Sequence, residues 1–150
     1  DSKRLQKVEQ NLHRLGLKAK CLVGDAATPE KWWDGKPFQR ILADVPCSAS
    51  GVVRRHPDIK WLRRESDIAK FATQQSSILD ALWRCLEQGG KLLYVTCSVF
   101  AEENSQQIVA FLQRHADAEL LPLPGLTERD LQLLPDQEHD GFYYALLAKL

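Results

Sequence analysis

Apolar residues recur at helical spacing in three stretches of the chain. The spacing of leucine and valine over residues 5–15 predicts a helix that ends at Gly16. A longer apolar face over residues 67–87 predicts a second helix, with Asp67 as its N-cap. The same periodicity over residues 102–115 predicts a third helix.

Short continuous apolar runs between the helices are typical of buried strands. They cover residues 18–23, 40–45, 91–96, 118–121 and 141–150. Strands that alternate with helices indicate a mostly parallel α/β sheet, and 150 residues are enough for one domain. In such sheets the ligand lies beyond the carboxyl ends of the strands.

Acidic and thiol-bearing residues stand at three of these predicted strand ends. Asp25 follows the first strand, the turn at 44–48 follows the second, and Cys97 lies at the end of the third. A turn or a helix cap is the plain alternative for Asp25, because aspartate is common at both. We nevertheless expect the functional site at this edge of the sheet.

The cysteine pattern argues against a metal site and against disulfides. The four cysteines are Cys21, Cys47, Cys85 and Cys97. None forms a C-x-x-C pair, and no histidine follows at zinc-finger spacing, so we expect no metal. We expect reduced thiols in a cytoplasmic protein, and no membrane span, because no run of about 18 apolar residues occurs.

Two of the cysteines are candidates for chemistry. In DVPCSASG a proline ends the strand, which leaves Cys47 in the cleft beside small residues that make room for a planar ligand. In YVTCS, Cys97 ends a strand shortly before the third predicted helix, whose N-terminal dipole favours a thiolate. A structural turn and a core cysteine are the alternatives. The two motifs lie 50 residues apart with one helix between, so their strand ends can be neighbours.

The net charge is zero, but basic residues are concentrated in the loop after Cys47. They are Arg54, Arg55, His56, Lys60, Arg63 and Arg64. A solvated face is the usual meaning of such a run. Because it starts close to a candidate nucleophile, we favour a polyanion site. Trp61 in the same loop could stack on a base, although core packing is the alternative we favour.

Three segments carry a resemblance to a known family. DVPCSASGVVRRHPDIKWLRR, GGKLLYVTCSVFAEEN and DGFYYALLAKL resemble the methyltransferase domain of the RsmB/Fmu/Sun family, bacterial 16S rRNA cytosine-C5 methyltransferases of the NOL/NOP/Sun group. The resemblance covers essentially all 150 residues. It implies a class I (Rossmann-like) S-adenosylmethionine-dependent methyltransferase sheet of strand order 3-2-1-4-5-7-6, truncated at the N-terminus. The first two strands, the cofactor loop and an RNA-binding region are expected upstream.

The same resemblance implies a role for each candidate residue. Cys97 would attack C6 of the cytosine, and Cys47 would assist removal of the C5 proton and product release. Asp44 would lie between cofactor and base, and Asp25 would contact the adenine part of S-adenosylmethionine. The basic loop would face phosphates of RNA, expected to be 16S rRNA. The alternative is a catalytically silent RNA-binding module that retains the methyltransferase fold; the absence of C-x-x-C argues against a thiol redox protein.

Overall fold

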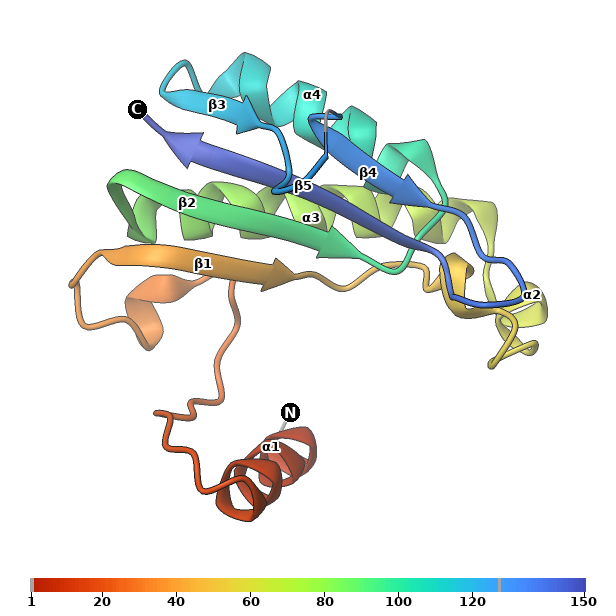
Figure 1. Cartoon of the computed structure of the whole chain (residues 1–150), viewed down its shortest axis with the longest axis horizontal. Helices are drawn as coiled ribbons and strands as arrows, with labels where there is room; N and C mark the ends of the chain where they lie inside the picture. The colour runs from red at the N-terminus through yellow and green to blue at the C-terminus, as the bar shows by residue number, and fades with distance from the viewer. Residues whose placement is uncertain (1, 127) are drawn as a thin grey trace.

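The computed structural model describes residues 2–126 and 128–150 and contains one mixed β-sheet (Figure 1). Four strands run in the order β1 (Phe38–Asp44), β2 (Leu86–Thr96), β5 (Phe142–Lys149) and β3 (Ala118–Leu121). A further strand, β4 (Asp130–Leu133), pairs with the other half of β5, so that β3 and β4 follow one another along the same edge. The order β1-β2-β5-β3 agrees with the 4-5-7-6 half of the class I methyltransferase sheet.

The pairing directions correct the expectation of a mostly parallel sheet. Only β1 and β2 run parallel, and every pair that includes β5 is antiparallel. The long helix between β1 and β2 provides the crossover that a parallel pair needs. The shorter connections from β3 and β4 to β5 allow antiparallel pairing. Sequence periodicity reports burial but not strand direction.

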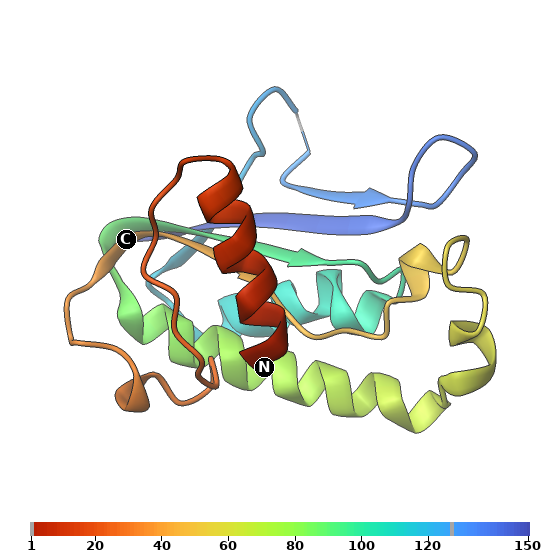
Figure 2. The same ribbon diagram turned by 90° about the horizontal axis from the view of Figure 1, so that it is seen from below.

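Two helices cover one face of the sheet. They are α3 (Glu65–Cys85) and α4 (Ser105–Arg114), which lie together below the strands in Figure 2. The predicted apolar faces are confirmed, because Ile78, Leu79 and Phe111 are buried in the core between helices and sheet.

Two further helices and three 3-10 turns complete the described structure. The helices α1 (Ser2–Arg14) and α2 (Ile59–Leu62) contain no buried residue. Single 3-10 turns occupy Pro29–Lys31, Ser50–Val52 and Ala101–Glu103. None of the described helices has the length and apolar character needed to cross a membrane.

The start of α3 differs slightly from the prediction. The helix begins two residues before Asp67, which is its third residue and not its N-cap. The Asp67 carboxylate accepts the backbone N–H of Arg64 at 3.1 Å, and the Asp67 N–H donates to the Arg64 carbonyl at 2.9 Å. The acid therefore still satisfies the helix end, from inside the first turn.

The predicted strand over residues 18–23 is absent. This segment is extended, has no strand partner among the described residues, and leaves Leu22 and Val23 exposed. A strand exists only where its backbone groups pair with a neighbour, and the outer edge of β1 makes no such pairing with this segment. Figure 1 shows α1 and the segment after it standing apart from the sheet.

Trp83 packs in the core, whereas Trp61 does not. Trp83 is buried and packs edge-to-face on Phe111, with ring centroids 5.1 Å apart. Trp61 is 88% exposed, so the favoured prediction of core packing is wrong for this residue. It lies on the single-turn helix α2, which contributes nothing to the core.

Candidate active site

Two thiols meet at the carboxyl end of the parallel strand pair. Asp44 at the end of β1 is in register with Val95 near the end of β2, so the loops that follow start side by side. The Sγ atoms of Cys47 and Cys97 are 3.3 Å apart, and both residues are partly exposed. The expectation of neighbouring strand ends is confirmed, and neither residue is a core cysteine, in contrast to the buried Cys85.

The two thiols differ in protonation. A hydrogen bond from the Cys47 thiol lowers the pKa of Cys97 to about 7, although burial and the nearby charges of Asp44 and Glu103 act against this. The same hydrogen bond, together with burial, raises the pKa of Cys47 far above its ordinary range. Near neutral pH Cys97 is therefore the thiol that ionises more readily, whereas Cys47 keeps its proton.

The cause of this asymmetry differs from the one expected from the sequence. The helix α4 begins only at Ser105, after a 3-10 turn, and the main stabiliser of the thiolate is the neighbouring thiol. A donor that lies 50 residues away in the chain leaves no local signal.

A buried carboxylate connects the two thiol-bearing loops. Glu103 is fully buried, and its Oε1 accepts the backbone N–H of Ser48 at 2.8 Å, while its Oε2 accepts the hydroxyl of Ser98 at 2.5 Å. The side-chain N–H of Gln75 on α3 also donates to Oε1, at 3.1 Å. Ser48 and Ser98 directly follow the two cysteines, so one side chain holds both loops and the long helix together.

Sequence reasoning missed Glu103. The available signal was the pair of acids in SVFAEEN, which follows Cys97 in one of the motifs that carry the resemblance. The sequence does not distinguish the two acids, whereas the structure buries Glu103 and leaves Glu102 exposed.

Three serine hydroxyls lie beside this carboxylate. The Oγ atoms of Ser48, Ser50 and Ser98 are 3.1 to 3.2 Å from one another. The Ser50 hydroxyl also accepts the backbone N–H of Val99 at 3.0 Å. This network holds the loop after β1 against the loop after β2.

Gly51 lies where three loops pack together. Its N–H donates to the Cys97 carbonyl at 2.8 Å, and its own carbonyl accepts the N–H of Gly141 at 2.8 Å. A Cβ atom on Gly51 would lie 2.2 Å from the Gly141 carbonyl oxygen. The small residues after Cys47 were expected to leave room for a planar ligand. Instead, Ser48 and Gly51 are buried and allow loop packing.

Half of the predicted basic residues make contacts within the chain. Arg54 and Arg55 form ion pairs with the buried carboxylate of Asp140. Arg63 donates from Nε to the Ser48 carbonyl at 2.7 Å, and its guanidinium lies over the ring of Phe71.

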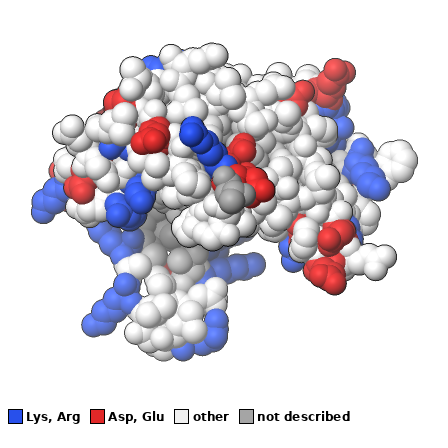
Figure 3. All heavy atoms as spheres, turned by 45° about the horizontal axis from the view of Figure 1, so that its top comes forward, with Lys and Arg blue, Asp and Glu red and all other residues white. Residues whose placement is uncertain are grey.

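The other three basic residues, His56, Lys60 and Arg64, have exposed side chains. Lysine and arginine side chains are spread over the face seen in Figure 3, including the protruding N-terminal segment at the bottom of that view. Contact of the basic loop with RNA phosphates stays a prediction.

The two predicted cofactor-binding aspartates lie in different surroundings. Asp44 is exposed at the end of β1, close enough for its charge to act on Cys97. Asp25 is also exposed, and its Oδ1 accepts the N–H of Ala27 at 2.9 Å. The turn that was the alternative for Asp25 is therefore present, but it engages only one of the two carboxylate oxygens.

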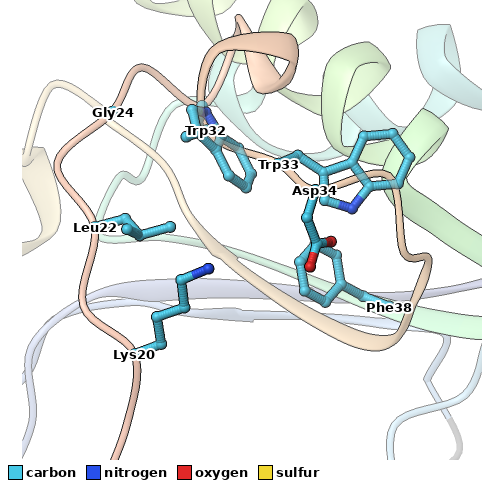
Figure 4. Close-up of a pocket in the computed structure, with 8 residues that line it drawn as sticks. Lys20, Leu22, Gly24, Trp32, Trp33, Asp34 and Phe38 are labelled. Atoms are coloured by element: carbon cyan, nitrogen blue, oxygen red, sulfur yellow. The ribbon is translucent and has the colours of Figure 1, made fainter.

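A cavity of about 440 Å³ lies near Asp25 but contains no thiol. Figure 4 shows Lys20 and Leu22 of the extended segment on one side, with Trp33 and Phe38 on the other. Phe38 starts β1, whereas Cys47 and Cys97 lie beyond its opposite end. Across the described residues, no three or more His, Cys, Asp or Glu side chains are grouped so that they could hold a metal ion.

Comparison with known proteins shows the family to which this chain belongs. A family model described as 16S rRNA methyltransferase RsmB/F matches residues 1–148. The chain is 53% identical to ribosomal RNA small subunit methyltransferase B of Yersinia enterocolitica and 55% identical to that of Erwinia tasmaniensis. Each alignment covers 99% of this chain and 35% of the relative.

Solved structures agree with these relatives. NSun6 from Pyrococcus horikoshii, solved with SFG, matches with a TM-score of 0.82 and 30% identity, over 99% of this chain and 39% of that one. A methyltransferase homolog from Pyrococcus horikoshii matches with a TM-score of 0.82 and 32% identity, over 100% of this chain and 51% of that one. The chain thus spans about a third of the length of the curated relatives it matches. It belongs to the 16S rRNA methyltransferase RsmB/F family.

Proposed function

We propose that the protein containing this chain transfers a methyl group from S-adenosylmethionine to C5 of a cytosine in small-subunit ribosomal RNA, in the cytoplasm. The observation that carries this proposal is the pair of thiols 3.3 Å apart at the carboxyl edge of the sheet, one with a lowered and one with a raised pKa. Family membership supports methylation of ribosomal RNA. The choice of C5 and the covalent route rest on the thiols.

Cys97 is the proposed nucleophile. C5 of cytosine is a weak nucleophile, and addition of a thiolate to C6 forms an S–C6 bond that increases the electron density at C5. A thiol with a pKa of about 7 is substantially ionised at neutral pH and is still a good nucleophile. The target base has to leave its stack to reach this thiolate.

Asp44 and Asp25 are the residues of this chain that would hold the cofactor. Both carboxylates are exposed, Asp44 at the end of β1 and Asp25 in the turn after the extended segment, and the turn engages only one oxygen of Asp25. These acceptors fit the hydroxyl and amino groups of S-adenosylmethionine, which when bound supplies an electrophilic methyl group. Asp44 also lies near the Cys97 thiolate.

Cys47 completes the reaction by a change in its own protonation. At rest it is held as a thiol chiefly by its hydrogen bond to Cys97 and by burial, with the Cys97 charge adding to both. Once Cys97 is bonded to C6 it carries no charge, so two of these three causes are removed. Cys47 then loses its proton to solvent, and its thiolate takes the proton from C5. The electrons of that C–H bond restore the C5–C6 double bond as the S–C6 bond breaks.

The exposed basic residues would orient the RNA. Lys60 and Arg64 can meet phosphates directly, whereas Arg63 supports the loop that carries Cys47 through the Ser48 carbonyl. The alternative of a catalytically silent RNA-binding module is less favoured, because RNA binding alone gives no reason for an ionised thiol beside a second thiol.

The proposal is tested in a full-length protein that includes these 150 residues. With S-adenosylmethionine and RNA, Cys97→Ala should abolish methylation at cytosine C5, because no thiolate reaches C6. Cys47→Ala should instead accumulate a covalent protein–RNA adduct that persists in denaturing gels. Cys85→Ala, which changes a buried cysteine outside the site, is the control and should form no adduct. Full activity of Cys97→Ala would refute the role assigned to Cys97.

A further inference from the structure

A cavity of about 750 Å³ opens directly beside the two thiol-bearing loops. Its lining includes Ser50, three residues after Cys47, and Phe100, three residues after Cys97. The Ser50 hydroxyl is within 3.2 Å of the Ser98 hydroxyl, so the two loops meet at the cavity wall. The opposite wall comes from α2 and the first turns of α3.

Apolar side chains, one of them aromatic, form part of the walls of this cavity. Phe100 is 39% exposed although it is a large apolar residue, and Ile59 and Ile68 face the same space. Single-stranded RNA is commonly bound by exposed aromatic rings on which unpaired bases stack. A concave apolar surface with one partly exposed ring fits the flat face of a nucleobase.

Charged groups in the lining complete the match to a nucleotide. Lys60 and Arg64 are exposed cations that suit the phosphates on either side of a bound base. Glu65 and Glu102 provide acceptors for the amino groups of a base edge. A lipid or an apolar peptide would use the walls but would have no use for cations and acceptors together.

We infer that this cavity holds the base of a nucleotide next to the target cytosine. The inference rests on the proposed function, since it requires the target base to be at Cys97. When the target base leaves its stack, the bases beside it lose a stacking partner, and Phe100 replaces that partner. Phe100 thereby becomes a residue that positions the substrate beside the target.

The test measures RNA binding and methylation separately, with the full-length protein. Substrate RNAs carry an abasic residue at each position flanking the target, one at a time, and affinity is followed by fluorescence anisotropy. For the wild type, one abasic position should weaken binding and lower kcat/KM about tenfold, the size expected for one stacked base. Phe100→Ala and Phe100→Leu should weaken binding of intact RNA by about tenfold and abolish the sensitivity to that abasic position.

Phe100→Leu keeps apolar volume in the cavity and so separates stacking from a loss of folding. Trp61→Ala is the comparison variant, because Trp61 is an exposed aromatic residue in the same basic loop but outside the cavity lining. It should retain the full abasic effect. The inference is overturned if the Phe100 variants retain that effect, or if Trp61→Ala removes it.

The two proposals fail in different ways. Methylation at C5 without any coupling between Phe100 and a flanking base would refute the cavity alone. Coupling in the binding assay without C5 methylation would refute the proposed reaction and leave the cavity supported.

Discussion

At the scale of single residues, the protonation of the cysteine pair is set by one contact. The Cys47 thiol donates to Cys97 and lowers its pKa, and the effect on Cys47 is opposite. Which of these two chemically identical thiols ionises more readily therefore depends mainly on which one donates the hydrogen bond, because burial raises the pKa of both. The Cys47 thiol ionises less readily, because burial and the hydrogen bond both raise its pKa.

This contact predicts the pH dependence of Cys97 reactivity. Alkylation of Cys97 by iodoacetamide should increase as pH rises through about 7, the region where its thiol ionises. In Cys47→Ala the stabilising hydrogen bond is lost, so the midpoint should move to higher pH. In Cys47→Ser a hydroxyl donor remains, and the midpoint should lie between the two. Peptide mass spectrometry reads out each site, and an unchanged midpoint in Cys47→Ala would contradict the assignment.

Glu103 predicts an effect on stability. Glu103→Ala leaves the Ser48 N–H and the Ser98 hydroxyl without their buried acceptor, which should lower the free energy of unfolding by about 2–4 kcal/mol. Glu103→Gln keeps one carbonyl oxygen and should cost less. The exposed neighbour is the matched control, since Glu102→Ala should change stability by no more than about 0.5 kcal/mol. Urea denaturation measures all three, and equal effects of the two alanine variants would contradict the role of the buried carboxylate.

At the scale of elements, the site depends on the close packing of three loops. Three loops meet at Gly51: the loops after β1 and β2 and the loop before β5. The backbone of Gly51 is hydrogen-bonded to Cys97 and to Gly141. The strands bring the loops to the same edge, but the hydrogen bonds between loops set their separation. Changes in loop packing should therefore affect activity even when the thiols are intact.

Gly51→Ala tests this packing. The new Cβ would lie 2.2 Å from a backbone oxygen, so the loops have to separate, and we expect a loss of about 1–3 kcal/mol in stability. In the full-length protein methylation should fall more steeply than stability explains, because the Cys47–Cys97 distance changes. Gly35→Ala is the control: it has a φ of +84° but open space around its Cβ, so it should cost about 1 kcal/mol and spare activity. Normal activity of Gly51→Ala would show that the loops tolerate the change.

The basic loop should divide into two functional groups. Lys60→Ala and Arg64→Ala should each reduce the salt dependence of RNA binding, by a slope of about 1 in log affinity against log salt. Arg63→Ala removes the donor to the Ser48 carbonyl. It should lower the methylation rate but change the salt dependence of RNA binding less than the other two variants do. Binding titrations at several salt concentrations distinguish the groups. If Arg63→Ala changes the salt slope by about 1 and leaves the methylation rate unchanged, Arg63 belongs with the residues that contact phosphates.

At the scale of the whole molecule, the β1 edge of the sheet exposes an apolar side chain. The outer edge of β1 has no strand partner among the described residues, and Leu42 on this strand is 68% exposed. Leu22 and Val23 of the extended segment are exposed as well. An unpaired strand edge with apolar side chains is a surface that normally requires covering.

We expect that these 150 residues alone bind S-adenosylmethionine only weakly and do not methylate RNA. Asp25 is presented from a segment that no neighbouring strand holds beside Asp44, so the two carboxylates are not fixed relative to one another by the sheet. Isothermal titration calorimetry of the 150-residue chain, compared with a full-length protein, measures this. Micromolar affinity of the short chain would show that the expectation is wrong.

Several features followed directly from the order of residues. The core helices and the strands at 40–45 and 91–96 were found because periodicity and apolar runs are local features of the sequence that indicate which positions are buried. The proline and the acid around Cys47, and the threonine before Cys97, marked both strand ends, so the two thiols could be assigned to one edge. Membership of the family also follows from these motifs.

Only the tertiary structure decided the features that join distant parts of the chain. It decided that β5 runs antiparallel, that residues 18–23 pair with none of the described strands, and that Trp61 is exposed. It also decided that Glu103 faces inward and that the two reactive thiols lie within 3.3 Å of one another. The physical reason is common to all of them. Strand pairing, burial of a charge and the pKa of a thiol are properties of contacts between residues, and the partners lie far apart in the sequence.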